Sequence, residues 1–147
     1  MARRYQILHP TDFSRASNAA LAVARSLATR NNGELLIVHV LVPPRVLYEV
    51  TNLSPRTYKL LMDETRNRAR RRLSALMKGL SGKRLPAKSR LLEGVPHLLI
   101  PQVARKARVD MIVMGTHRRR GAAGLLLGSV AARVLRLASC PVLTVRA

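Results

Sequence analysis

The chain has 147 residues, the length of one ordinary domain, and apolar residues make up 48% of it. It carries 27 lysine and arginine residues against 7 aspartate and glutamate residues, so its formal net charge is +20 with histidine neutral. This apolar content argues against a disordered chain. No apolar run approaches the roughly 18 residues of a membrane span, and a single cysteine, Cys140, cannot form an internal disulfide. We therefore expect one soluble, cytoplasmic domain over residues 1–147.

Strand and helix patterns alternate along the whole chain. The pattern predicts strands at Tyr5–His9, Glu34–Leu41, Lys88–Leu92, Asp110–Met114 and Pro141–Arg146. It predicts helices that follow Ser14, Ser54, Val95 and Gly128 and end near Asn31, Lys78, Ala107 and Ala138. Pro101 lies inside the third helix and indicates a kink or a late start there.

Helical spacing also predicts which side chains face the core. In the second helix these are Tyr58, Met62, Ala69, Leu73 and Leu76, and in the last helix Val130, Val134, Leu137 and Ala138. The arginines between residues 66 and 72 then spread over the rest of the helix, which is more typical of a solvated face than of a binding strip.

Five strands that alternate with four helices predict right-handed crossovers and a doubly wound parallel sheet with helices on both faces. In such a sheet the ligand lies beyond the carboxyl ends of the strands, where the strand order reverses. The segments 10–14, 40–44, 93–96 and 115–129 are therefore the candidate binding segments.

The segment from Met114 to Val130 carries the strongest local signal. It leaves an apolar strand, passes four glycines and enters a helix at Gly128-Ser129. Free N–H groups and the dipole at a helix N-terminus favour an anion, and glycine lets the backbone approach phosphate oxygens. Taken alone, the segment is equally compatible with an ordinary strand-to-helix loop.

Other segments support the first interpretation. The opening Ile7-Leu8-His9-Pro10-Thr11-Asp12-Phe13-Ser14, then His39-Val40, Gly94-x-Pro96, Ile112-Val113-Met114-Gly115-Thr116-His117 and Cys140-Pro141-Val142-Leu143-Thr144-Val145 follow in one order. Together they resemble the universal stress protein family over essentially the whole chain. The family motif is Gly, two residues, Gly, nine residues, Gly, then Ser or Thr. Here it reads Gly115, Arg118, Gly128 and Ser129, so arginine replaces the middle glycine.

The resemblance implies an adenine-nucleotide alpha-hydrolase-like fold with strand order 3-2-1-4-5. It also implies a regulatory module that binds ATP, with Mg²⁺, or a related adenine nucleotide. Asp12, beside Pro10 and Thr11, would contact the ribose, and the backbone of Val40 would pair with adenine. Ribose and phosphates would meet Gly115, Gly128, Ser129 and Val130. We also expect Met114, His117 and Arg118 at the nucleotide site, where the guanidinium of Arg118 could hold a phosphate in place of the motif glycine.

Two other functional classes are weighed against this one. Enzymatic activity finds less support, because the chain has no Gly-x-Ser-x-Gly elbow, no phosphate-binding Gly-x4-Gly-Lys-Ser/Thr loop and few carboxylates. The alternative is a nucleotide-free interaction module whose basic surface engages nucleic acid or other anionic partners. Twenty-two of the 27 cations are arginine, which suits phosphate, whereas the scarcity of aromatic residues argues against a single-strand binder.

Strand order 3-2-1-4-5 would leave the last strand at an edge of the sheet. Its residues Val142, Leu143, Thr144 and Val145 form a short run that is apolar apart from the threonine, a composition that invites pairing with another chain. We expect a homodimer through this edge, which is also how many family dimers form, and we expect Leu143→Pro to block it.

Overall fold

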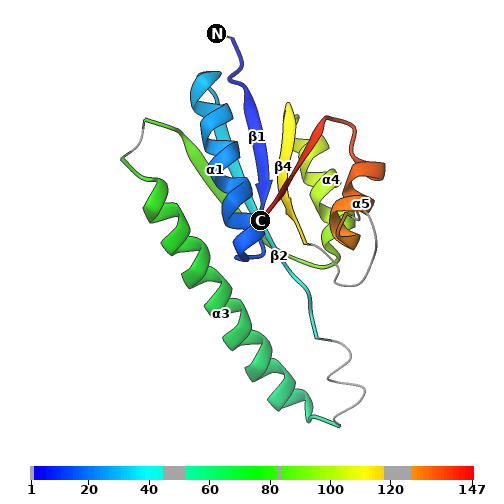
Figure 1. Ribbon diagram of the computed structural model, residues 1–147. Helices are drawn as coiled ribbons and strands as arrows, with labels where there is room; N and C mark the ends of the chain where they lie inside the picture. The colour runs from blue at the N-terminus through cyan, green and yellow to red at the C-terminus, as the bar shows by residue number, and fades with distance from the viewer. Residues whose placement is uncertain (1, 45–51, 83, 118–126) are drawn as a thin grey trace.

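The computed structural model describes residues 2–44, 52–82, 84–117 and 127–147. Over these residues the chain forms strands and helices in the alternating order that the sequence predicts (Figure 1). The strands are β1 (Gln6–Pro10), β2 (Glu34–Leu41), β3 (Ala87–Glu93), β4 (Met111–Thr116) and β5 (Val142–Arg146). The helices are α1 (Arg15–Arg30), α3 (Pro55–Leu80), α4 (Pro96–Ala107) and α5 (Ser129–Leu137).

All neighbouring strands pair in parallel, in the order β3-β2-β1-β4-β5. This confirms the predicted doubly wound α/β fold and places β5 at an edge. The strand order reverses between β1 and β4, which are adjacent in the sheet although α1, β2, α3, β3 and α4 separate them in the chain. A crevice for a ligand is therefore expected at the carboxyl ends of β1 and β4.

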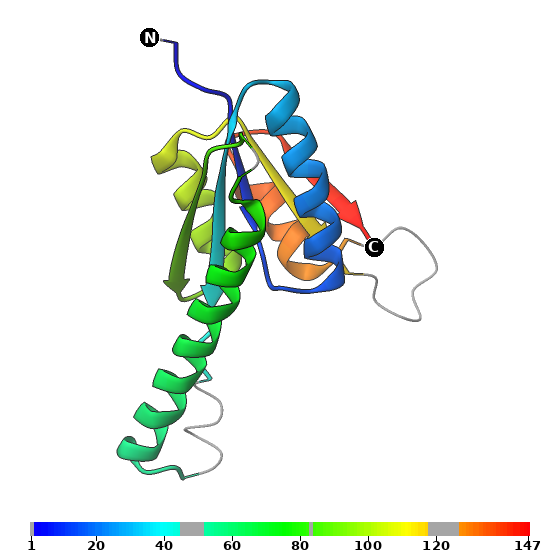
Figure 2. The same ribbon diagram turned by 90° about the vertical axis from the view of Figure 1, so that its left-hand side faces the viewer.

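The helices form two layers, with α1 and α3 on one side of the sheet and α4 and α5 on the other (Figure 2). Each side has its own core. Leu8, Val38 and Ile112 belong to the cluster under α4 and α5, whereas Ile7 and Ile37 belong to the one under α1 and α3. Adjacent residues of one strand therefore pack into opposite cores, because side chains alternate between the two faces of a sheet.

Small side chains bring α1 close to the sheet. Ala20, Ala24 and Ala28 are fully buried at helical spacing. Ser14 caps the helix, and its side chain accepts a hydrogen bond of 3.2 Å from the N–H of Ser17. The predicted start of this helix is confirmed.

Helix α3 is longer than the sheet and projects beyond it (Figure 1). Met62, Ala69 and Leu73 are buried as predicted, and Tyr58 and Leu76 are partly buried. The helix begins with Pro55 after the cap Ser54, as the sequence indicates.

Parts of two predictions about the other layer are wrong. Val134 is buried and Ala138 is partly buried as predicted, but Val130 and Leu137 are 36% and 49% exposed, and Ala131 is buried instead. The face that packs on α4 starts at the small Ala131, whose size lets the helices approach, whereas the sequence pattern weighted the larger side chains. Helix α4 begins at Pro96 and continues through Pro101, so it does not start late, and the alternative of a kink at Pro101 stays a prediction. Among the described helices none is long and apolar enough to cross a membrane.

Candidate functional site

A pocket opens at the carboxyl ends of β1, β2 and β4 and at the first turn of α5. It encloses about 240 Å³. Its walls include ten of the predicted site residues, namely Pro10, Thr11, Asp12, Val40, Met114, Gly115, His117, Gly128, Ser129 and Val130. Arg118 lies outside the described residues. The fold thus brings the predicted residues to one place, and their binding of a nucleotide stays a prediction.

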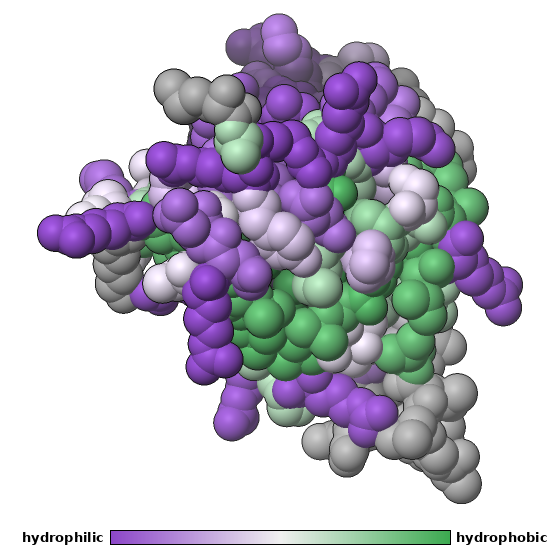
Figure 3. All heavy atoms as spheres, turned by 90° about the horizontal axis from the view of Figure 1, so that it is seen from above, coloured by the Kyte–Doolittle hydropathy of each residue, from purple (hydrophilic) through white to green (hydrophobic). Residues whose placement is uncertain are grey.

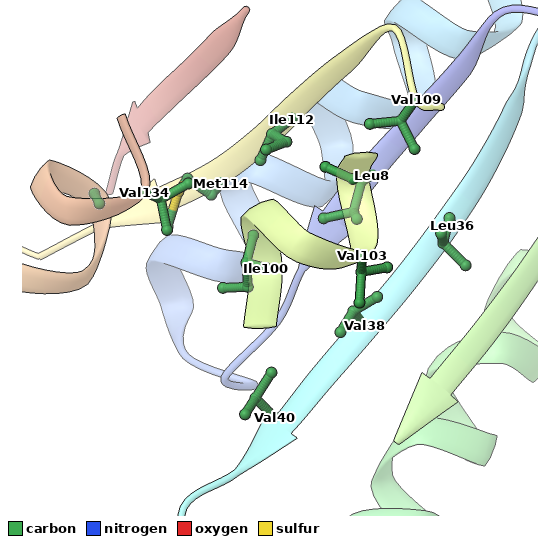
Figure 4. Packing of buried hydrophobic residues seen from close by; sticks show 12 residues of the cluster. Leu8, Leu36, Val38, Val40, Ile100, Val103, Val109, Ile112, Met114 and Val134 are labelled. Carbon is green, nitrogen blue, oxygen red and sulfur yellow. The ribbon is translucent and has the colours of Figure 1, made fainter. Parts of the chain in front are cut away.

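One wall of the pocket is apolar. Val38 and Val40 reach it from β2, Met114 from β4, and Pro96 and Ile100 from α4. Figure 4 shows the side chains of Val38, Ile100 and Met114 on the side of the sheet that α4 covers. Such a slot between aliphatic side chains suits a flat, weakly polar ring.

Asp12 is held at the pocket by the turn between β1 and α1. Its Oδ1 accepts hydrogen bonds from the N–H of Ser14 (2.9 Å) and the hydroxyl of Ser17 (2.7 Å). Thr11 supports the same turn, because its hydroxyl accepts from the N–H of Phe13 at 3.0 Å. Phe13, which follows Asp12 in this turn, has a φ of 62°, which few residues other than glycine adopt.

The same contacts keep Asp12 ionised. Burial raises the pKa of Asp12, but hydrogen bonds from Ser14, His117 and Ser17 outweigh burial and hold that pKa well below its usual range. The Nε2 atom of His117 lies 3.0 Å from Oδ2 of Asp12, and both side chains are more than half exposed. The pocket mouth therefore presents a carboxylate and an imidazole side by side.

The opposite end of the pocket is the N-terminus of α5. Its N-cap is Gly128, which has no side chain to satisfy the first N–H groups, and the first turn contains no acidic residue. The first backbone bond of the helix runs from Ala132 N–H to Gly128 C=O at 3.0 Å, so the N–H groups of residues 129–131 precede it. These three groups and the helix dipole can receive an anion.

Thr116, the last residue of β4, and His117, which follows it, determine where α5 begins. The hydroxyl of Thr116 accepts a hydrogen bond of 2.7 Å from the N–H of Gly128. A Cβ on Gly128 would lie 3.3 Å from the backbone N of His117, a tighter contact than most Cβ atoms make, so a larger residue here would require a small shift of the backbone. The close approach of these two backbones explains a motif glycine in this position.

Packing alone explains why position 115 is a glycine. A Cβ at this position would lie 2.5 Å from the carbonyl carbon of Ala16 in α1. The glycine is therefore required for α1 to pack on β4, whether or not it also touches a ligand.

Sequence reasoning missed several pocket residues, namely Ser17, Val38, Ile100, Thr116 and Ala131. Four of them look like ordinary core or helix positions in the sequence. Thr116 carried a signal that could have been used, because a hydroxyl at the end of a buried strand needs a hydrogen-bond partner.

In the edge strand β5, the backbone groups of Leu143 do not point to the open side as expected. The N–H of Ile112 donates to the C=O of Pro141 at 2.9 Å, and Ile112 is level with Val142. Parallel pairing alternates along a strand, so Leu143 directs its backbone groups to β4, whereas Val142 and Thr144 direct theirs to the open side. Leu143→Pro would therefore damage the sheet itself, and the expected effect of that substitution is corrected.

A model of the universal stress protein family matches residues 4–146. The chain belongs to the universal stress protein family. Universal stress protein MJ0577 of Methanocaldococcus jannaschii is 28% identical, with 96% of this chain and 94% of the relative covered. MJ0531 of the same organism is 32% identical, with 96% and 81% covered.

Solved structures agree with this family assignment. The structure of MJ0577 superimposes with a TM-score of 0.80 at 28% identity and covers 99% of this chain and 98% of its own. A universal stress family protein from Burkholderia pseudomallei gives a TM-score of 0.76 at 28% identity, with 98% and 97% covered. The predicted family and fold are confirmed.

Proposed function

We propose that this universal stress protein binds an adenine nucleotide, ATP or a related one, as a regulatory ligand in the pocket between β1, β4 and α5. The observation that supports this most directly is that one pocket combines an apolar wall with a helix N-terminus that no side chain caps. Two solved structures that share the fold also support the proposal. One is a universal stress protein in complex with cAMP (24% identity, TM-score 0.63), and the other is an Arabidopsis thaliana family protein with AMP bound (18%, 0.64).

The pocket residues fit such a ligand in three parts. The adenine lies between Val38, Val40 and Ile100, where the faces of its ring are buried away from water. The ribose hydroxyls donate to Asp12, whose carboxylate accepts hydrogen bonds only. The phosphates meet the free N–H groups at Ser129 and its neighbours. The enclosed 240 Å³ is smaller than the roughly 300 Å³ at which whole-ligand pockets begin, so the phosphates extend toward the open end.

Magnesium would reach this site with the nucleotide. Among the described residues no group of three or more histidine, cysteine or carboxylate side chains could hold a metal ion. Asp12 contributes the one carboxylate to the described walls of the pocket. Mg²⁺ keeps most of its waters and binds through phosphate oxygens in such sites, so the phosphates would hold the ion.

The substitution Ser129→Asp tests this assignment. A carboxylate in the first turn stabilises a helix by about 0.3–1 kcal/mol, yet it repels a phosphate at the same place. We expect AMP and ATP to bind at least about tenfold more weakly, a difference of about 1.4 kcal/mol, in isothermal titration. Adenosine, which has no phosphate, should bind the variant as it binds the wild type, and Ser129→Asn should bind all three ligands normally.

Two results would contradict the proposal. One is wild-type protein that binds neither AMP nor ATP at millimolar concentration. The other is equal AMP affinity in the wild type, the S129D variant and the S129N control, which would place the phosphate away from α5. Thermal unfolding of S129D, expected at or above the wild-type temperature, separates lost binding from lost folding.

We further propose that the protein is a homodimer through β5. The strand lies at the edge of the sheet, Leu143 is 38% exposed, and the backbone groups of Val142 and Thr144 face the open side. Pairing with a second β5 about a two-fold axis would satisfy those groups.

A further inference from the structure

The larger helix layer of the fold carries most of the helical cations. Helices α1 and α3, of 16 and 26 residues, together carry eleven cations and two carboxylates, whereas the shorter α4 and α5, of 12 and 9 residues, carry four cations and no carboxylate. Both carboxylates, Asp63 and Glu64, lie in the N-terminal half of α3. Residues 13–33 and 65–92 contain no acidic residue at all.

The described carboxylates are already engaged elsewhere. Asp110 pairs with Arg3, and Asp12 faces His117. Around the first half of α3, Asp63 and Glu93 both pair with Arg66, and Glu64 pairs with Arg68. Glu34 accepts a hydrogen bond from the side chain of Gln6. None of these described carboxylates forms an ion pair with the part of α3 that follows Arg68 or with the exposed side of α1.

A set of cations on that layer consequently has no ion-pair partner in the part of the chain that the structure describes. They line two shallow grooves. One groove combines Arg25 and Arg30 of α1 with Arg84, beside the hydroxyls of Ser26 and Thr29. The other runs along α3 and is lined by Arg70, Arg71, Ser74, Ala75 and Lys78. We call the six cations Arg25, Arg30, Arg70, Arg71, Lys78 and Arg84 the basic face.

The basic face is separate from the pocket. Its residues are absent from the pocket walls, which lie at the carboxyl ends of the strands. Figure 3 shows long hydrophilic side chains over the left and upper parts of the opposite end of the molecule, where α3 ends, and hydrophobic residues gathered in one area below the centre. Further hydrophilic side chains border this hydrophobic area below and on the right.

We propose that the basic face binds the phosphodiester backbone of double-stranded nucleic acid. Five of its six cations are arginine, whose planar guanidinium binds phosphate oxygens in pairs, and the serine and threonine hydroxyls between them add donors of the kind that contact a backbone. The six cations come from two helices and a turn, so they span a surface rather than a point. A cation that has no carboxylate partner binds a phosphate without first breaking an ion pair, and each such contact releases counterions from the duplex.

The same surface indicates the mode of recognition. The described residues that line its grooves include no aromatic side chain on which an unpaired base could stack. The contacts therefore go to the backbone and are independent of base sequence. Binding should be strong at low salt, weak at high salt, and better for a duplex than for a single strand of equal length.

A charge-matched pair of variants tests the proposal. The first replaces four cations of the basic face with glutamine, Arg30, Arg71, Lys78 and Arg84. The second replaces four on the other layer, Arg105, Lys106, Arg133 and Arg136. All eight residues are exposed, and each set removes three arginines and one lysine, so the change in net charge is the same.

Fluorescence anisotropy of a labelled duplex DNA is measured for each protein between about 50 and 200 mM salt. Each lost phosphate contact lowers the steepness of log K against log salt by about 0.9, so the basic-face variant should lose about 3 to 4 units of slope. The variant of α4 and α5 should stay within about one unit of the wild type. AMP titration and circular dichroism confirm that both variants keep the pocket and the fold.

The outcomes separate the alternatives. Equal losses in the two variants would overturn the proposal, because they would show that net charge rather than this face attracts DNA. Wild-type protein that ignores the duplex at about 50 mM salt would overturn it as well. So would stronger binding to phosphatidylserine vesicles than to DNA at the same salt, which would make an anionic membrane the partner. AMP binding is read independently, so failure here leaves the nucleotide proposal intact.

Discussion

The hydroxyl of Thr116 accepts a 2.7 Å hydrogen bond from the N–H of Gly128, twelve positions later in the chain. Thr116 is the last residue of β4, and Gly128 immediately precedes α5. This single contact ties the two ends of the intervening segment together. It therefore fixes the start of α5 at the switch point, where the proposed phosphate site lies.

Replacing Thr116 with valine should weaken both stability and nucleotide binding. Thr116 is only 5% exposed, so the valine variant leaves the Gly128 N–H without its acceptor. The expected loss is about 1–3 kcal/mol of unfolding free energy in urea, with a lower affinity for AMP. Thr116→Ser keeps the hydroxyl and should retain most of both. A valine variant with unchanged stability would show that the hydrogen bond does not position α5.

Gly115→Ala should destabilise the protein before any ligand is added. The new Cβ would stand 2.5 Å from a backbone carbon of α1, a contact that neither backbone can relieve by a side-chain rotation. We expect a loss of about 1–3 kcal/mol, measured by urea unfolding.

Gly79→Ala is the matched control for this substitution. Gly79 lies in α3, and nothing stands within 4 Å of its added Cβ among the described residues. Alanine should stabilise the helix there by up to about 1 kcal/mol. Similar effects of the two substitutions would contradict a packing role for Gly115.

Most of the fold could be predicted from the sequence because its signals are local. The apolar run of β2 and the capping serines Ser14 and Ser54 each act within a few residues. The inner face of α5 could not be read in this way, because the neighbouring helix α4 selects the small Ala131 over the larger Val130.

The candidate site likewise contains residues that local sequence signals mark and residues that only the fold reveals. The predicted residues Asp12 and Ser129 are marked by their place at the ends of elements, and both reach the pocket. Ser17 and Thr116 were missed because their role depends on partners five and twelve residues away that only the fold brings near. The direction of the backbone groups at Leu143 likewise depends on its register with β4.

His9 should make stability depend on pH. The side chain is fully buried, its Nδ1 lies 2.9 Å from the C=O of Val113, and its Nε2 has no partner among the described residues. Burial lowers the pKa of His9, although the hydrogen bond to Val113 and the charge of Asp12 act in the opposite direction. The folded protein therefore binds a proton at this ring less readily than the unfolded chain does.

The sign of the effect follows from that difference. Stability is fully present above the ordinary histidine pKa of about 6.5 and falls as the pH drops below it, by up to about 1.4 kcal/mol per unit. Urea unfolding at pH values of about 7.5, 6 and 5 should show this fall in the wild type and a smaller one in His9→Gln. Equal pH dependence in the two proteins would contradict it. Asp12 does not confuse the comparison, because its protonation matters only below about pH 4.

Thr144→Pro should separate the proposed dimer. Its backbone faces the open side of β5, so proline removes a donor from the edge while the pairing with β4 persists. We expect sedimentation to show wild-type dimers and T144P monomers at micromolar concentration, with a cooperative urea transition for both. Leu143→Pro should instead lower stability directly. A monomeric wild type, or a folded T144P that stays dimeric, would contradict the proposed interface.

The most direct measurement is a crystal structure of the protein grown with ATP and Mg²⁺. We predict adenine between Val40 and Ile100, a ribose hydroxyl on Asp12, and phosphate oxygens at the N–H groups of Ser129 and Val130. Nucleotide bound on another surface, or an empty pocket in crystals grown at saturating ATP, would contradict it.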